Sequence, residues 1–360
     1  MISRLLTMLL AVAMFTVLTQ GNSHASDEDR GYENEGNLQS HGPGSSALSE
    51  LSGAGDSNEA SSALARGRES AGAVAPDQGK ASNKKAELFK SPDAAAEAFV
   101  AALRKGDTAR LEAIFGDASL ISSGDAVADR IDRERFLREY DRKHSLGGQG
   151  MVTLHIGESA MPFAVPIVKG KGGYYFDAVA GAREVIFRRV GRNERRAIAV
   201  CSGYVAAQKE YALSAHDGQP PGTYAQKLMS DEGRRNGLYW PAKEDELRSP
   251  AGRALAAAEA EGYGVSTAGK SSPYRGYLYR VLTSQSEHAR DGAKNYMDGS
   301  GRQVGGFALI AYPADYGRSG VKSFIVNQDS IVYEKDLGPK TVELASGIRE
   351  FDPQGWKIAL

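Results

Sequence analysis

Two carboxylates could act together in catalysis. Asp125 and Asp129 are four residues apart, which places them one turn apart if that stretch is helical. Two nearby carboxylates can take separate acid and base roles. The same residues can equally be a helix cap and a surface charge. The sequence therefore assigns no catalytic residue, but it leaves Asp125 and Asp129 as the candidates that a cell-wall or polysaccharide hydrolase would use.

Aromatic residues gather in the second half of the chain and could form a recognition surface. Of the 16 tyrosines, 14 lie beyond residue 170. Rigid aromatic side chains with polar tips are favoured at such surfaces. The alternative is structural, with tyrosine hydroxyls tying glycine-rich loops to a sheet. The predicted ligand-binding residues are Tyr239, Trp240, Tyr277, Tyr312 and Tyr316.

Arginines are concentrated toward the start of a long helical pattern. A dense basic cluster could attract anionic lipid or glycan. Glu184 and Glu194 are interleaved with these arginines, and we interpret the pattern as a solvated helix face. The arginines are Arg188, Arg189, Arg192, Arg195 and Arg196.

A nucleotide site is not expected, although Gly264 to Ser271 fit the pattern G-x4-G-K-[ST]. Phosphate binding by this pattern needs a buried strand before the loop and a helix after it. Here a helix-like stretch precedes the loop and Pro273 follows it.

No metal or other cofactor is expected either. The histidines of the folded part, His144, His155, His216 and His288, form no helical or strand pair of the kind that binds a metal. Cys201 lies on an apolar helix stripe and is predicted to pack in the core. As the only cysteine, it also excludes an intramolecular disulfide, a cysteine zinc site and an iron–sulfur cluster.

Composition and the first 85 residues indicate an exported protein with a flexible tether. The 360 residues carry 44 basic and 45 acidic side chains, a balance that argues against nucleic acid as a partner. Residues 1–25 have the pattern of a signal peptide cleaved after Ala25, which leaves no transmembrane span and places the protein in the periplasm or outside the cell. Residues 26–85 are predicted to be a disordered linker.

Two folded regions of an α+β protein are expected beyond the linker. In residues 86–177, helices after Ser91, after Asp107 and over 132–142 precede strands at 151–156, 163–168 and 174–176, in a cone-like order. In residues 178–360, a helix over 178–214, with an interruption at Gly191, should pack on antiparallel strands near 277–282, 307–311, 323–326 and 331–333.

Two resemblances follow from ordered motifs. The motifs 188–194 (RRVGRNE), 208–211 (QKEY), 237–241 (GLYWP), 305–308 (GGFA) and 312–320 (YPADYGRSG) resemble the bacterial domain-of-unknown-function family 2950, exported proteins of uncharacterised role. This resemblance covers about residues 89–356. Ser330 stands where glycine is expected in the last hairpin. The second resemblance rests on shorter motifs over about 190–340, including Asn193, Glu194, Gln208 and Tyr211, which look like those of pilin-like exported proteins.

Element order alone suggests a third resemblance. The order of helices and strands in the first region looks like the nuclear-transport-factor-2-like (NTF2-like) fold.

The sequence thus favours a non-enzymatic binding or structural module of the cell envelope or the extracellular space. Its expected partner is an envelope glycan or another envelope protein. The alternatives are the hydrolase named above and a small-ligand carrier that uses a pocket in the cone-like first region.

Overall fold

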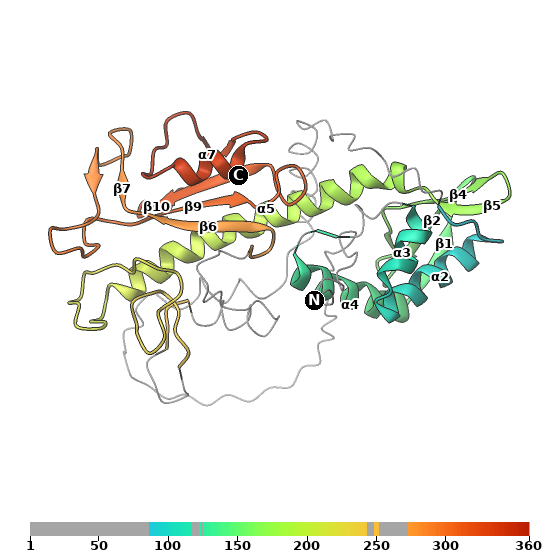
Figure 1. The fold of residues 1–360 in the computed structure, drawn as a ribbon, viewed down its shortest axis with the longest axis horizontal. Coiled ribbons are helices and arrows are strands. Elements are labelled where there is room, and N and C mark those ends of the chain that lie inside the picture. The colour runs from blue at the N-terminus through green and yellow to red at the C-terminus, as the bar shows by residue number, and fades with distance from the viewer. Residues whose placement is uncertain (1–85, 117–121, 124, 243–247, 252–272, 360) are drawn as a thin grey trace, which may run out of the picture.

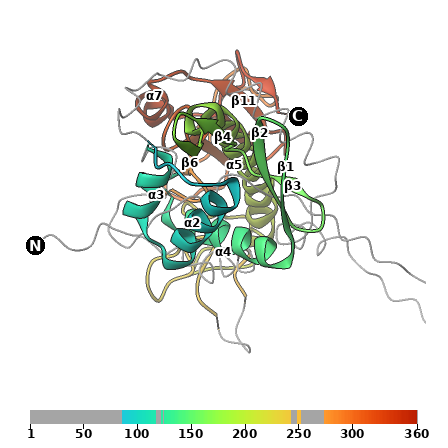
Figure 2. The same cartoon turned by 90° about the vertical axis from the view of Figure 1, so that its right-hand side faces the viewer.

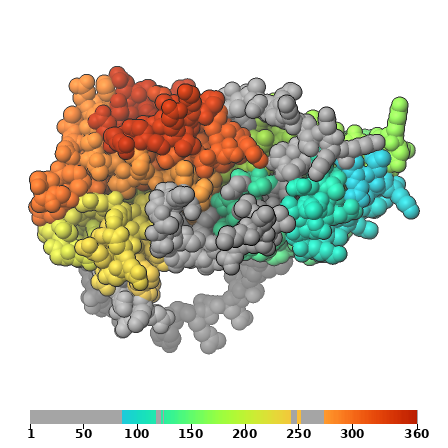
Figure 3. Space-filling model, in the orientation of Figure 1, coloured from blue at the N-terminus to red at the C-terminus, as the bar shows by residue number. Residues whose placement is uncertain are grey.

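The computed structural model describes residues 86–116, 122–123, 125–242, 248–251 and 273–359. The predicted signal peptide, the predicted linker and the Gly264 to Ser271 segment lie outside these residues. Helices and antiparallel sheets make up the chain, so the predicted α+β class is confirmed. We call residues 86–177 the first region and residues 212–359 the second region. They lie at opposite ends of the molecule, and the long helix α5 joins them (Figures 1 and 3).

The first region begins with three helices whose starts are fixed by side-chain caps. They are α2 (Pro92–Lys105), α3 (Thr108–Phe115) and α4 (Ala126–Arg142). Ser91 and Asp107 accept hydrogen bonds from the first turns of α2 and α3, as predicted. Helix α4 begins six residues earlier than the predicted 132, because Asp125 caps it by accepting from the Ala128 amide.

A small antiparallel sheet completes the first region. Its strands are β1 (His144–Gly147), β2 (Met151–Ile156), β3 (Met161–Pro162), β4 (Ile167–Gly170) and β5 (Gly173–Phe176). The expected strand at 163–168 is wrong over most of its length, because the chain turns between β3 and β4. In Figure 2, helices α2, α3 and α4 lie on one side of this region and strands β1 to β3 on the other.

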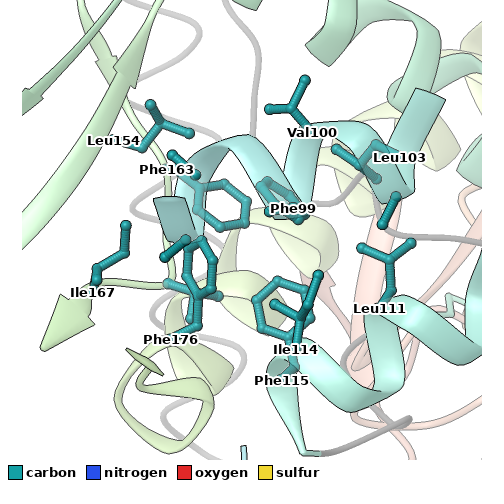
Figure 4. Packing of buried hydrophobic residues seen from close by; sticks show 14 of the residues in the cluster. Phe99, Val100, Leu103, Leu111, Ile114, Phe115, Leu154, Phe163, Ile167 and Phe176 are labelled. Carbon is teal, nitrogen blue, oxygen red and sulfur yellow. The ribbon is translucent and has the colours of Figure 1, made fainter. Parts of the chain in front are cut away.

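Phenylalanine rings fill the space between these helices and the sheet (Figure 4). Phe99 is fully buried at their centre, and its ring centroid lies 5.0–5.5 Å from those of four neighbours. The neighbours are Phe115, Phe136, Phe163 and Phe176. The apolar cluster continues into α5 through Ala178 and Val185, so this helix helps to build the first core.

Helix α5 (Ala178–Tyr211) runs for 34 residues, about 50 Å at 1.5 Å per residue, and contributes to both regions. The expected interruption at Gly191 is absent, and Gly191 is buried within the continuous helix. Tertiary packing outweighs the ~1 kcal/mol by which glycine disfavours a helix interior. Beyond Ala197 the buried stripe of α5 turns to the second region.

The second region is a five-stranded antiparallel sheet between two helices. The sheet order is β12-β11-β10-β9-β6, with β6 (Tyr277–Leu282), β9 (Ala308–Pro313), β10 (Lys322–Asn327), β11 (Tyr333–Asp336) and β12 (Lys357–Ile358). A separate pair is formed by β7 (Ser284–Gln285) and β8 (Lys294–Asn295). Ser330, where glycine was expected, has a φ of 67° in the turn after β10.

Each face of this sheet has its own core. Phe324 and Leu309 pack against α5 through Cys201 and Val205. On the other face, Ile310 and Ile325 pack with Ala345 of α7 (Thr341–Gly347) and with Phe351. Strand β9 is therefore buried along its whole length.

The stability of the first region is expected to depend on Phe99. Replacing Phe99 with alanine removes the ring that four others contact, and we expect a loss of about 3–5 kcal/mol in the free energy of unfolding. Urea unfolding of the purified protein measures this change. Val179→Ala on the exposed side of α5, where the side chain is 76% exposed, is the control and should change stability by less than about 0.5 kcal/mol. Similar losses in both variants would contradict the packing role of Phe99.

Candidate functional site

Charged side chains meet in a buried junction where the start of α4 lies against the middle of α5. Asp125, Asp129 and Asp132 follow each other at spacings of four and three, so they share one side of the amino-terminal part of α4. Arg189, Arg192 and Arg196 follow at spacings of three and four on α5. We call these six residues, together with Arg135, which pairs with Asp132, the charged junction.

One buried ion pair fixes α4 to α5 inside this junction. Nη2 of Arg192 donates to Oδ2 of Asp132 at 2.7 Å, and both side chains are nearly inaccessible to solvent. Nη1 of Arg135 lies 3.7 Å from the other oxygen of Asp132. A buried carboxylate needs such partners because it has lost its contact with water. Removing one member of a buried pair therefore typically destabilises a protein by about 3–5 kcal/mol.

The two candidate catalytic carboxylates also lie in the junction. Asp125 caps α4, which confirms the cap alternative for this residue. Asp129 is only 1% exposed, so the alternative that it is a surface charge is wrong. Its carboxylate accepts a hydrogen bond from the Ser123 amide at 3.0 Å. Burial raises the pKa of Asp129, and the Ser123 hydrogen bonds and the charge of Arg189 only partly oppose this effect.

The arginines of α5 do not form the solvated face that the sequence indicates. Arg188 does pair with Glu184, at 2.8 Å on a half-buried surface. Arg189 and Arg192 are buried instead, because α4 and the loop before β10 cover that side of the helix. Burial lowers the pKa of Arg189 to about 10 and that of Arg196 to about 9.

A second set of contacts fixes α5 to the loop before β10. Oε1 of Glu194, a fully buried residue, accepts hydrogen bonds from the amides of Val321 and Lys322 at 3.1 and 3.0 Å. Nδ2 of Asn193 donates to the Ser319 carbonyl at 2.9 Å. The motifs 188–194 and 312–320, far apart in sequence, therefore meet here.

Close packing explains one glycine of the second motif. A Cβ atom at Gly320 would lie 2.2 Å from the hydroxyl oxygen of Tyr277. That hydroxyl donates to the Lys322 carbonyl at 2.8 Å, so it cannot move away without losing its partner. The Tyr277 hydroxyl therefore has a structural role, because it links the start of β6 to the start of β10.

The expectation of one exposed aromatic surface is corrected by burial. Tyr239, Trp240, Tyr277 and Tyr312 are all buried. Tyr277 and Tyr312 belong to strands β6 and β9, and Trp240 packs with the end of α5. Among the five candidates only Tyr316 is partly exposed, and its hydroxyl donates to Asp336 at 3.0 Å. The ligand-binding role of these residues remains a prediction.

The remaining reactive side chains occupy packed positions. Cys201 is fully buried in the core, as predicted, and burial raises its pKa to about 12. His216 is buried and stacks on Tyr211, with 4.0 Å between the ring centroids. Within the described part of the chain, no three histidine, cysteine or acidic side chains are arranged to hold a metal ion.

Comparison with known protein families matches residues 86–359 to the family described as "Protein of unknown function (DUF2950)". The chain belongs to this family. The DUF2950 match contains both regions and the whole charged junction. No curated protein and no solved structure matches the chain, so the pilin-like and NTF2-like resemblances stay predictions. In the described residues, no helix is both long enough and apolar enough to cross a membrane.

The hydrogen bonds of Glu194 are expected to hold α5 and the sheet together. Glu194→Ala leaves two buried amides without an acceptor, and we expect the free energy of unfolding to fall by about 2–5 kcal/mol. Glu194→Gln keeps an acceptor oxygen and should lose less. Chemical denaturation of both variants measures the difference. Equal losses would show that charge, rather than the two hydrogen bonds, is the main contribution.

The buried carboxyl of Asp129 is expected to make stability depend on pH. Its pKa is higher in the folded chain than the ordinary 3.8, so the folded state favours the protonated form and loses stability as pH rises through the folded pKa. Asp129→Asn resembles the protonated form, so its stability relative to wild type should increase between pH 4 and pH 7. Urea unfolding across that range measures the change. A relative stability that falls with pH would contradict this assignment.

Proposed function

We propose that this protein is a non-enzymatic, exported binding or structural module of the cell envelope or extracellular space. The observation that carries the proposal is the fixed connection between the two regions through α5. This helix packs in both cores, and it is held by Arg192 to α4 and by Glu194 to the loop before β10. Binding surfaces held in fixed positions lose little conformational entropy when a partner binds. The division into domains at 86–177 and 178–360 is part of this proposal.

The partner we propose is an envelope glycan or another envelope protein. Tyr316 is the candidate contact residue, because its ring is partly exposed while its hydroxyl is held by Asp336. The hydrogen bond to Asp336 fixes the orientation of the ring. An aromatic ring with a polar tip suits contact with sugars and with protein surfaces.

The hydrolase is the second candidate function. The raised pKa of Asp129, four residues from Asp125, is the observation that favours it, because a carboxyl with a raised pKa can act as an acid in catalysis. Against it, Asp129 is 1% exposed and hydrogen-bonded to Ser123, so a glycan would need α4 and α5 to separate before reaching it. The carrier alternative has less support, since phenylalanine rings occupy the interior of the first region.

Sedimentation with isolated peptidoglycan, polysaccharide and anionic vesicles tests this function. We expect the purified protein to be retained by an envelope material without releasing soluble fragments. Tyr316→Ala should weaken retention by about tenfold or more, the effect of losing one central aromatic contact. Tyr175→Ala, at a half-buried tyrosine of β5, is the matched control and should bind as the wild type does. Released fragments would overturn the non-enzymatic function and direct attention to Asp125 and Asp129.

A further inference from the structure

Two buried arginines of the charged junction differ in their counter-charges. Arg192 pairs with Asp132 at 2.7 Å, whereas Arg189 forms no ion pair among the described residues. The nearby Glu194 directs an oxygen to the amides of Val321 and Lys322. A buried charge is costly unless a counter-charge is present.

Hydrogen-bond donors in the junction are also left without acceptors. Nε and Nη2 of Arg189 are buried and have no hydrogen-bond partner among the described residues, and the same is true of Nε of Arg192. Arg189 is 2% exposed. An unsatisfied buried donor destabilises a fold, and more so if it is charged. The fold therefore presents two neighbouring guanidinium groups, three residues apart on α5, with unused donors.

The arrangement of these donors identifies the kind of group that would use them. Nε and Nη2 of one arginine form a fork that binds two oxygens of a single oxyanion. Nε of Arg192, three residues along the same helix, is a further unused donor. A tetrahedral dianion offers oxygens in several directions and two negative charges, whereas a carboxylate offers two coplanar oxygens and one charge.

We propose that the charged junction binds a phosphate-type oxyanion between Arg189 and Arg192. The anion accepts the unused donors of both side chains and supplies a counter-charge for Arg189 at the contact between α4 and α5. Because α4 belongs to the first region and α5 to both, the bound anion stabilises the connection between the regions. This inference does not depend on the proposed envelope function.

Titration calorimetry and thermal unfolding of the purified protein, with inorganic phosphate at constant ionic strength, test the proposal. We expect one phosphate per chain and a saturable rise in Tm that equivalent chloride does not produce. Acetate, the planar monoanion, should bind at least tenfold more weakly. Binding of glycerol phosphate as well would identify the terminal phosphate of an ester as the ligand, and binding of inorganic phosphate alone would identify the free ion.

Two arginines of α5 provide the variant and its control. Arg189→Met removes the unused donors and should weaken phosphate binding at least tenfold. Arg183→Met removes the same charge from an exposed position of the helix and should leave binding unchanged. If Arg189→Met does not fold, Arg189→Lys keeps the charge without the fork and should also weaken binding at least tenfold. The proposal is overturned if wild type shows no saturable response, if acetate binds equally well, or if the Arg189 and Arg183 variants respond alike.

Discussion

The burial of charge at the midpoint of α5 is the constraint on which the rest of the structure depends. A 34-residue helix joins two hydrophobic cores, and between those cores it carries Arg189, Arg192 and Glu194 out of water. Buried charges need partners, because the free-energy cost of removing a charge from water otherwise exceeds what its other contacts contribute. Asp132 comes to Arg192 from the first region, and the amides of residues 321 and 322 come to Glu194 from the second. The positions of α4 and of the loop before β10 follow from these contacts.

The two halves of the junction differ in how completely their polar groups are satisfied. On the Glu194 side, two amides and the Ser319 carbonyl have partners from α5. On the Arg189 side, guanidinium nitrogens remain unused within the described residues, and the pKa values of Arg189 and Arg196 are lowered by burial. On the Glu194 side the polar groups only hold the fold together, whereas on the Arg189 side donors remain for the proposed anion. Four of the five aromatic candidates are buried, and most of these pack with the sheet or with the end of α5.

Much of the fold could be predicted from local patterns. Ser91 and Asp107 start helices where their capping chemistry requires, and Cys201 lies in the stripe that packs on the sheet. The start of α4 was missed because its first turns carry Asp129 and Asp132, which give no apolar periodicity although both are buried. The candidate site was only partly predictable. The pairing of Asp125 with Asp129 is visible from spacing, but nothing in the sequence shows that Arg192 reaches Asp132, 60 residues away.

The sequence by itself determined the α+β class, the long helix on the antiparallel sheet, the caps of α2 and α3, and membership of its family. These properties depend on residue spacing, which a linear pattern contains. Only the tertiary structure decided which polar side chains lose contact with water. Arg188 and Arg189 are adjacent and chemically identical, yet one pairs with Glu184 at the surface and the other is buried against α4. The difference arises because a helix turns 100° per residue, so the packing of distant segments, rather than residue type, selects the side that is covered.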